Sequence, residues 1–170
     1  MIQTYFGGGK GKTTAALGLA IRCIGCGNKV LFVQLLKNNN SAEFKAMEEI
    51  KNIDVLCSDE HYELYDNLNE DRTLALSKAY SKLLFEDVKS KAGSYQMIVL
   101  DERLDAVEFG YIAEDELLSL ISEIKLNSEI ILTGHNITEK ISNISDYISK
   151  INEIKHPYTK GVLAREGIEY

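Results

Sequence analysis

Short apolar segments recur along the chain and alternate with segments in which apolar residues follow a helical period. The apolar segments predict strands at 2–6, 29–36, 53–57, 96–100, 129–133 and 147–155. The amphipathic segments predict helices at 13–26, 41–51, 69–92, 113–125 and 137–144. Strands that are apolar throughout are covered on both faces, so the pattern predicts a mostly parallel sheet between helical layers.

This alternation predicts a single α/β domain over 1–170, with three layers and a mostly parallel central sheet. Ligands of such sheets bind at the carboxyl ends of the strands. Polar side chains follow the predicted strands at 7–14, 37–40, 101–102, 133–136 and His156. We therefore expect the functional site on that edge.

The first strand runs into a glycine-rich turn that opens a helix, the arrangement of a phosphate-binding loop. The turn consists of Gly7, Gly8, Gly9, Lys10, Gly11, Lys12, Thr13 and Thr14. Its glycines allow backbone N–H groups to face one point, and the helix N-terminus adds positive potential. We expect Lys12 to contact phosphate oxygens and Thr13 to offer its hydroxyl to magnesium.

The loop is one residue shorter than the usual pattern. Three residues separate Gly7 from Gly11, where the common motif has four, and Phe6 stands where the first glycine would fall. A shorter loop seats a phosphate chain differently, which hints at chemistry other than ordinary ATP hydrolysis.

The predicted strand at 96–100 ends in two carboxylates, Asp101 and Glu102. Beside a phosphate loop, such a pair is expected to bind magnesium, directly or through water. The alternative is an acidic strand end that only caps a neighbouring helix. His135 follows another strand and either contacts phosphate or bonds a backbone carbonyl.

Composition limits the possible ligands. The chain has 170 residues, 45% hydrophobic and 26% charged, as in ordinary globular domains. Its net charge of −7 argues against a nucleic-acid partner. Because no apolar run reaches membrane-spanning length and the first residues read as a strand, we expect a cytoplasmic protein without a membrane partner.

Four segments together resemble the P-loop ATP:corrinoid adenosyltransferases, which make adenosylcobalamin. The loop GGGKGKTTAALGLA is similar to that family's G-x-G-K-G-K-T-T-A-A-x-G, and VLFVQLLKN to its V-x-x-x-Q-F-x-K-G. VLDE matches its acidic strand end, and IKHPYTKGVLAREGIEY resembles its ending V-K-H-P-Y-x-x-G-x-x-A-x-x-G-I-D/E-F/Y. The resemblance spans nearly the whole chain and implies a P-loop NTPase-like (RecA-like) fold.

The resemblance implies that the 5′-deoxyadenosyl group of ATP passes to a cobalt(I) corrinoid and that intact triphosphate leaves. This is the reaction of a cob(I)yrinic acid a,c-diamide adenosyltransferase in cobalamin biosynthesis. ATP would lie in reverse along the loop, with Lys12 and Glu102 as catalytic residues and Lys10 as a further phosphate contact. Magnesium (or manganese) would bind Thr13 and Glu102, with Asp101 in support. The family also suggests a homodimer and a flavoprotein reductant.

The chain departs from the family pattern mainly on the corrinoid side. The family's Phe-x-Trp pair has no direct counterpart, because the chain contains no tryptophan. Tyr62, Leu64 or Tyr65 would replace that pair. Tyr62 and Tyr65 are the candidates to wall a corrinoid, although packing of both onto the core is at least as strong an alternative. Arg103 stands where the family commonly has an apolar residue, and His135 stands where it usually has an arginine. Two alternatives thus stay open: a P-loop ATP hydrolase or kinase, and a non-catalytic nucleotide-binding relative with an altered corrinoid site.

Overall fold

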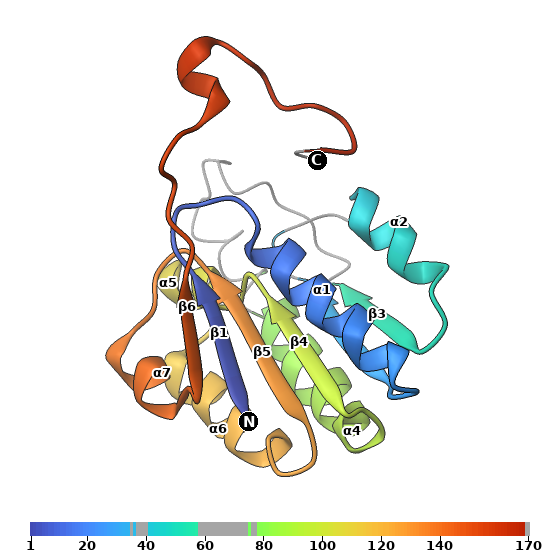
Figure 1. Cartoon of the computed structure of the whole chain (residues 1–170). Helices are drawn as coiled ribbons and strands as arrows, with labels where there is room; N and C mark the ends of the chain where they lie inside the picture. The colour runs from blue at the N-terminus through green and yellow to red at the C-terminus, as the bar shows by residue number, and fades with distance from the viewer. Residues whose placement is uncertain (35, 37–40, 58–74, 76–77, 169–170) are drawn as a thin grey trace.

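The computed structural model has a parallel sheet at its centre (Figure 1). It describes residues 1–34, 36, 41–57, 75 and 78–168. Within these residues the strands are β1 (Ile2–Phe6), β2 (Val30–Gln34), β3 (Ile53–Cys57), β4 (Met97–Asp101), β5 (Glu129–Gly134) and β6 (Tyr147–Lys150). Their order across the sheet is β3-β2-β4-β5-β1-β6, and every pair is parallel. The predicted α/β fold class is confirmed.

Helices cover both faces of the sheet (Figure 1). The first face carries α1 (Lys12–Gly25) and α2 (Ala42–Glu48). The second carries the π-helix η1 (Leu83–Val88), α4 (Lys89–Lys91), the 3₁₀ turn η2 (Ala92–Ser94), α5 (Arg103–Glu108), α6 (Glu114–Ile124) and α7 (Glu139–Ile144). A 3₁₀ turn, η3 (Pro157–Lys160), lies in the tail. None of the helices in the described part of the chain combines the length and apolar character needed to span a bilayer.

Alternate residues of the central strands enter two separate cores. On β2, Phe32 packs with Ala16 and Met47 on the α1 side, whereas Leu31 and Val33 pack on the α6 side. The side chains on both faces of these strands are fully buried, which explains why the strands are apolar throughout. The two cores clamp the sheet and fix the positions of its strand ends.

Three predicted boundaries were wrong in informative ways. The second strand ends at Gln34 rather than at residue 36, because Leu36 has φ +57° and turns the chain away. The last strand ends at Lys150, since its partner β1 ends at Phe6. Gly93 lies inside η2 instead of capping a helix in the left-handed region. The start of the helix predicted at 69–92 falls outside the described residues.

The helix α5 was not predicted, and it packs tightly against the end of β5. A Cβ atom added to Gly134 would lie 2.5 Å from Cβ of Leu104 and 3.1 Å from the backbone nitrogen of Asp105. Only glycine fits there, because the neighbouring atoms belong to the first turn of a helix. This contact places α5 at the carboxyl edge of the sheet.

We predict that Gly134→Ala destabilises the fold by about 1–3 kcal/mol, the usual cost of overpacking. Gly18→Ala is the matched control, because Gly18 is an exposed residue of α1 with nothing within 4 Å of the added Cβ. There the substitution should stabilise the helix by about 0.5–1 kcal/mol. Urea unfolding of both variants tests the contact, and equal effects at the two positions would contradict it.

Candidate nucleotide site

The first half of the glycine-rich loop is built into the protein. The N–H of Gly7 donates to the carbonyls of Gly134 and His135 at 3.2 and 3.0 Å, and that of Gly9 donates to the carbonyl of Ile151 at 2.9 Å. Neither glycine has room for a side chain, because an added Cβ on Gly7 would lie 2.3 Å from the Ile151 oxygen. The segment after β6 therefore holds the loop closely.

The second half of the loop faces a cavity of about 160 Å³. Lining residues from the loop and α1 are Lys10, Gly11, Lys12, Thr13 and Thr14. Gly11 adopts φ +112° as it turns the chain into α1, and the cavity lies at the N-terminus of this helix, where the first N–H groups have no partner within the helix. Pockets that enclose whole ligands typically measure about 300–1,000 Å³. This cavity is smaller and suits a polyphosphate tail.

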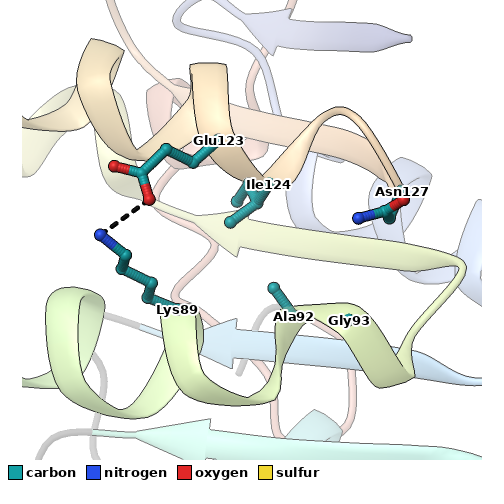
Figure 2. A pocket seen from close by; sticks show the side chains of 6 residues that line it. All are labelled: Lys89, Ala92, Gly93, Glu123, Ile124 and Asn127. Carbon is teal, nitrogen blue, oxygen red and sulfur yellow. Dashed lines mark ion pairs between the residues drawn. The ribbon is translucent and has the colours of Figure 1, made fainter.

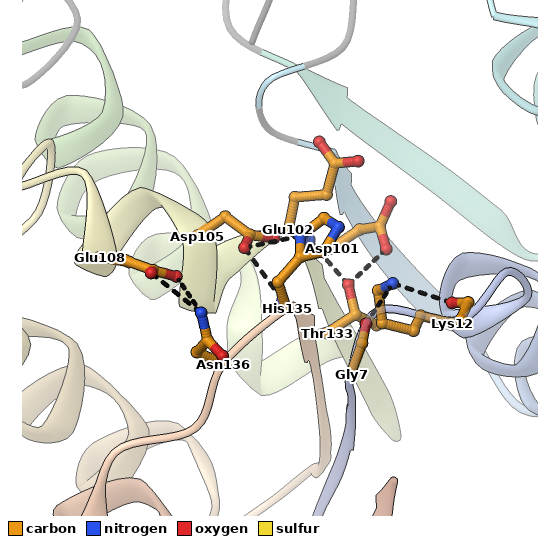
Figure 3. Close-up of polar contacts among 10 residues, drawn as sticks. Gly7, Lys12, Asp101, Glu102, Asp105, Glu108, Thr133, His135 and Asn136 are labelled. Carbon is orange, nitrogen blue, oxygen red and sulfur yellow. Dashed lines mark hydrogen bonds and ion pairs between the residues drawn. The ribbon is translucent and has the colours of Figure 1, made fainter. Parts of the chain in front are cut away.

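Lys12 spans the loop from inside. Its Nζ donates to the carbonyl of Gly7 at 2.8 Å and to that of Gly9 at 3.1 Å (Figure 3). An ammonium group has three N–H donors, so one remains for a ligand in the cavity. Lys10 also lines the cavity, and its Nζ donates to the carbonyl of Ile168 in the tail at 2.6 Å.

A buried carboxylate joins the loop to the neighbouring strands. Asp101, which is 0% exposed, accepts hydrogen bonds from the Thr13 hydroxyl at 3.0 and 3.2 Å. It also accepts one from the Thr133 hydroxyl at 2.7 Å, and the same Thr133 oxygen accepts from the N–H of Glu102 at 2.8 Å (Figure 3). Because β5 lies between β1 and β4, Thr133 can bridge the two halves of the site.

Glu102 has a left-handed backbone, with φ +56° and ψ 22°. A non-glycine residue rarely adopts this conformation, which costs on the order of 1–3 kcal/mol unless the surroundings enforce it. Here the N–H bonds to Thr133 and the carbonyl accepts from the N–H of Ala106 at 3.2 Å. The turn directs the Glu102 side chain to the cavity, which it lines.

The loop after β5 is anchored to α5. Asp105 accepts from the backbone N–H of His135 at 2.9 Å, and its Oδ1 lies 2.9 Å from Nδ1 of the same ring (Figure 3). One residue further, Nδ2 of Asn136 donates to both carboxylate oxygens of Glu108 at 2.9 and 3.0 Å. Asp105 and His135 both line the cavity.

Comparison with known proteins identifies the family. The family model described as ATP:corrinoid adenosyltransferase BtuR/CobO/CobP matches residues 1–170. The chain belongs to this family. It is 28% identical over 173 residues to the corrinoid adenosyltransferase of Escherichia coli (strain K12), covering 100% of this chain and 85% of that protein.

Two further relatives have similar coverage. The corrinoid adenosyltransferase CobA of Salmonella typhimurium is 27% identical over 172 residues, with 100% of this chain and 85% of that protein covered. The corrinoid adenosyltransferase of Pseudomonas aeruginosa is 26% identical over 174 residues, with 100% and 83% covered. The matches extend across the loop, the acidic strand end and the tail.

Several residues predicted for this adenosyltransferase site come together at the carboxyl edge. Lys10, Gly11, Lys12, Thr13, Thr14, Glu102 and His135 line one cavity, and Asp101 lies beneath it. Gly7, Gly8 and Gly9 do not line the cavity, and two of their N–H groups are already bonded. His156 caps η3, its Nδ1 accepting from the N–H of Tyr158 at 3.2 Å. Tyr62, Tyr65 and 37–40 lie outside the described residues.

Sequence reasoning missed two supporting residues, Thr133 as the bridge to Asp101 and Asp105 as the partner of His135. Both contacts depend on which strand lies between β1 and β4, and the sequence pattern does not specify this order. A signal existed for Asp105: it lies four residues after Asp101, which is one helical turn beyond the strand end if a helix begins at residue 103.

A second cavity, of about 210 Å³, lies between the α4–η2 segment and the end of α6, on the second face of the sheet (Figure 2). Its lining residues are Lys89, Ala92, Gly93, Glu123, Ile124 and Asn127. Lys89 and Glu123 face each other across it with Nζ and Oε2 2.7 Å apart, so their charges offset one another. This cavity lies away from the strand ends that carry the loop and the acidic pair.

Among the described residues of the adenosyltransferase, Arg103 is a buried cation without a hydrogen-bond partner. Arg103 is 0% exposed, and Nε, Nη1 and Nη2 of its guanidinium make no hydrogen bond within the described part of the chain. Burial lowers the pKa of Arg103 to about 9, and the nearby Tyr80 hydroxyl acts in the opposite direction. This value lies well below the pKa of an ordinary guanidinium, so the unfolded chain holds this proton more tightly than the folded protein does.

We predict that Arg103→Met stabilises the protein by about 1–4 kcal/mol at pH 7, because an apolar chain of similar length replaces a buried charge. The cost of the charge is present in full below about pH 9, and it falls as the pH rises above that value. The gain in the free energy of unfolding should therefore shrink under alkaline conditions. Urea titrations at pH 7 and pH 10 measure it.

Arg22→Met is the matched control, since Arg22 is exposed on α1 and should change stability little. A loss of stability in Arg103→Met, or a gain that grows with pH, would contradict the unpartnered burial of this guanidinium.

Proposed function

We propose that this chain transfers the 5′-deoxyadenosyl group of ATP to the cobalt(I) ion of a corrinoid and releases triphosphate. The cobalt supplies the electron pair of the new bond to the 5′ carbon. The bond between that carbon and its oxygen breaks, and its electrons leave with the triphosphate. Cobalt(I) thereby becomes an alkyl-cobalt(III) product, and no water is consumed.

The loop supports this proposal most directly. The N–H groups of Gly7 and Gly9 are used within the protein, so the groups available for phosphates are concentrated at Lys10–Thr14. A triphosphate seated there meets the first turn of α1 and the ammonium of Lys12, which offset the charge that develops on a leaving triphosphate. The protein thus acts mainly by positioning the nucleotide and by stabilising the leaving group.

The residues beside the loop fit a magnesium ion. Thr13, Asp101 and Glu102 supply one hydroxyl and two carboxylates, and magnesium prefers oxygen ligands that include one or two carboxylates together with substrate phosphates. When bound, the ion would offset charge on the triphosphate. Asp101 already orients the Thr13 hydroxyl, so the donor set is arranged before a ligand arrives.

The corrinoid side of the site rests on the family relationship. Tyr62 and Tyr65 remain predictions for contacts to the macrocycle, as do the flavoprotein reductant, the homodimer and the cytoplasmic location. Because the cavity lies at the carboxyl ends of the strands, the second substrate would approach the nucleotide from this edge of the sheet.

Product analysis tests the proposal. With ATP, magnesium and a chemically reduced corrinoid, we expect an adenosylated corrinoid with the spectrum of an alkyl-cobalt compound, together with triphosphate. Lys12→Ala should slow transfer about 100-fold or more, because removal of one charged donor to a developing anion typically has this effect. Lys125→Ala, at an exposed position just after α6, is the control and should leave the rate unchanged.

Other products would contradict the proposal in different ways. ADP with phosphate would indicate a hydrolase, and unchanged ATP despite tight binding would indicate a nucleotide-binding module. A near-normal rate in Lys12→Ala would show that the loop has been assigned the wrong role.

A further inference from the structure

His135 is held in one orientation by Asp105. The Oδ1 atom of Asp105 accepts from the backbone N–H of His135 and lies 2.9 Å from its ring Nδ1. The two side chains differ sharply in exposure: that of Asp105 is 2% exposed and that of His135 is 51% exposed. A buried carboxylate therefore fixes one side of a ring whose other side is open.

The packing of α5 against β5 prevents this pair from rearranging. An added Cβ on Gly134 would lie 3.1 Å from Oδ2 of Asp105 and 2.5 Å from Cβ of Leu104, so helix and strand end are in direct contact. The pair Asn136–Glu108 holds the next residue of the loop to the far end of α5 (Figure 3). The carboxylate and the ring thus sit on two rigidly joined elements.

The bond from Nδ1 determines what the other ring nitrogen can do. An ionised carboxylate only accepts, so the proton of this contact lies on Nδ1 of His135. Within the described residues Nε2 makes no hydrogen bond, and the ring lines the same cavity as Lys10 and Lys12. Nε2 is the ring atom left for a ligand.

We propose that Asp105 is a positioning residue, which presents Nε2 of His135 to the triphosphate of the nucleotide. Phosphate oxygens only accept hydrogen bonds, so Nε2 must donate and the bound ring is an imidazolium, whose charge the Asp105 carboxylate offsets. Together with Lys12 it places positive charge on two sides of the cavity. This role rests on the proposed function only in taking a nucleoside triphosphate as the ligand.

Binding of inorganic tripolyphosphate with magnesium tests the pair without sugar or corrinoid. We expect His135→Gln to weaken binding about tenfold or more, as for loss of one charge-assisted hydrogen bond. Asp105→Asn keeps the shape and one acceptor oxygen but removes the charge, and should weaken binding about threefold or more. Glu116→Gln, which removes an exposed carboxylate of α6 outside the cavity lining, is the control and should bind normally.

A double-mutant cycle separates positioning from support of the fold. If Asp105 acts through His135, then Asp105→Asn should have no further effect on tripolyphosphate binding in the His135→Gln background. The ring ¹⁵N spectrum adds a direct readout, because the chain has only 3 histidines to assign. The His135 signal should report a proton on Nδ1 in the parent protein, and this preference should weaken in Asp105→Asn.

Three results would overturn the inference: unchanged binding in His135→Gln, an equal loss from Asp105→Asn in both backgrounds, or a His135 ring without a proton on Nδ1. The outcome is independent of the proposed reaction. If tripolyphosphate binding depends on His135 but no adenosylated product forms, the proposed reaction is refuted and the role of the Asp105–His135 pair stands. If transfer is normal and both variants bind tripolyphosphate normally, only the role of the pair is refuted.

Discussion

The site depends on one buried carboxylate and the two hydroxyls that bond to it. Asp101 is removed from water, so its charge must be compensated by hydrogen bonds, and Thr13 and Thr133 supply them. These bonds connect the start of α1, the end of β4 and the end of β5. They form here because β5 lies between β1 and β4 and all three strands are parallel, so that their carboxyl ends meet. The strand order thus brings together the residues of the site.

The tail makes the short loop rigid before a ligand arrives. After β6 the chain passes so close to the loop that neither Gly7 nor Gly9 could carry a side chain, and Ile151 accepts the N–H of Gly9. Later in the tail, the carbonyl of Ile168 accepts from Lys10. A site whose donors are already ordered loses little entropy on binding and need not reorganise when charge develops on a leaving group. The short loop is therefore held in its conformation by the tail.

Local patterns in the sequence predicted the sheet, the loop and the acidic strand end, because each depends on a short segment with its own signature. The Lys12–Thr13 pair and Asp101 lie where those signatures placed them. Contacts between distant segments were not predictable in this way. The helix α5 is six residues long and follows a strained Glu102, so it has too few turns to show a helical period.

The central claim concerns the direction of the nucleotide in the site. A crystal structure of the protein with magnesium and ATP, without corrinoid, tests it most directly. The account predicts that the triphosphate lies along Lys10–Thr14 and that the 5′ carbon of the ribose faces outward from the carboxyl edge of the sheet, where a cobalt ion can approach it. A nucleotide in the opposite direction, with its last phosphorus facing outward and its ribose turned away, would contradict the account.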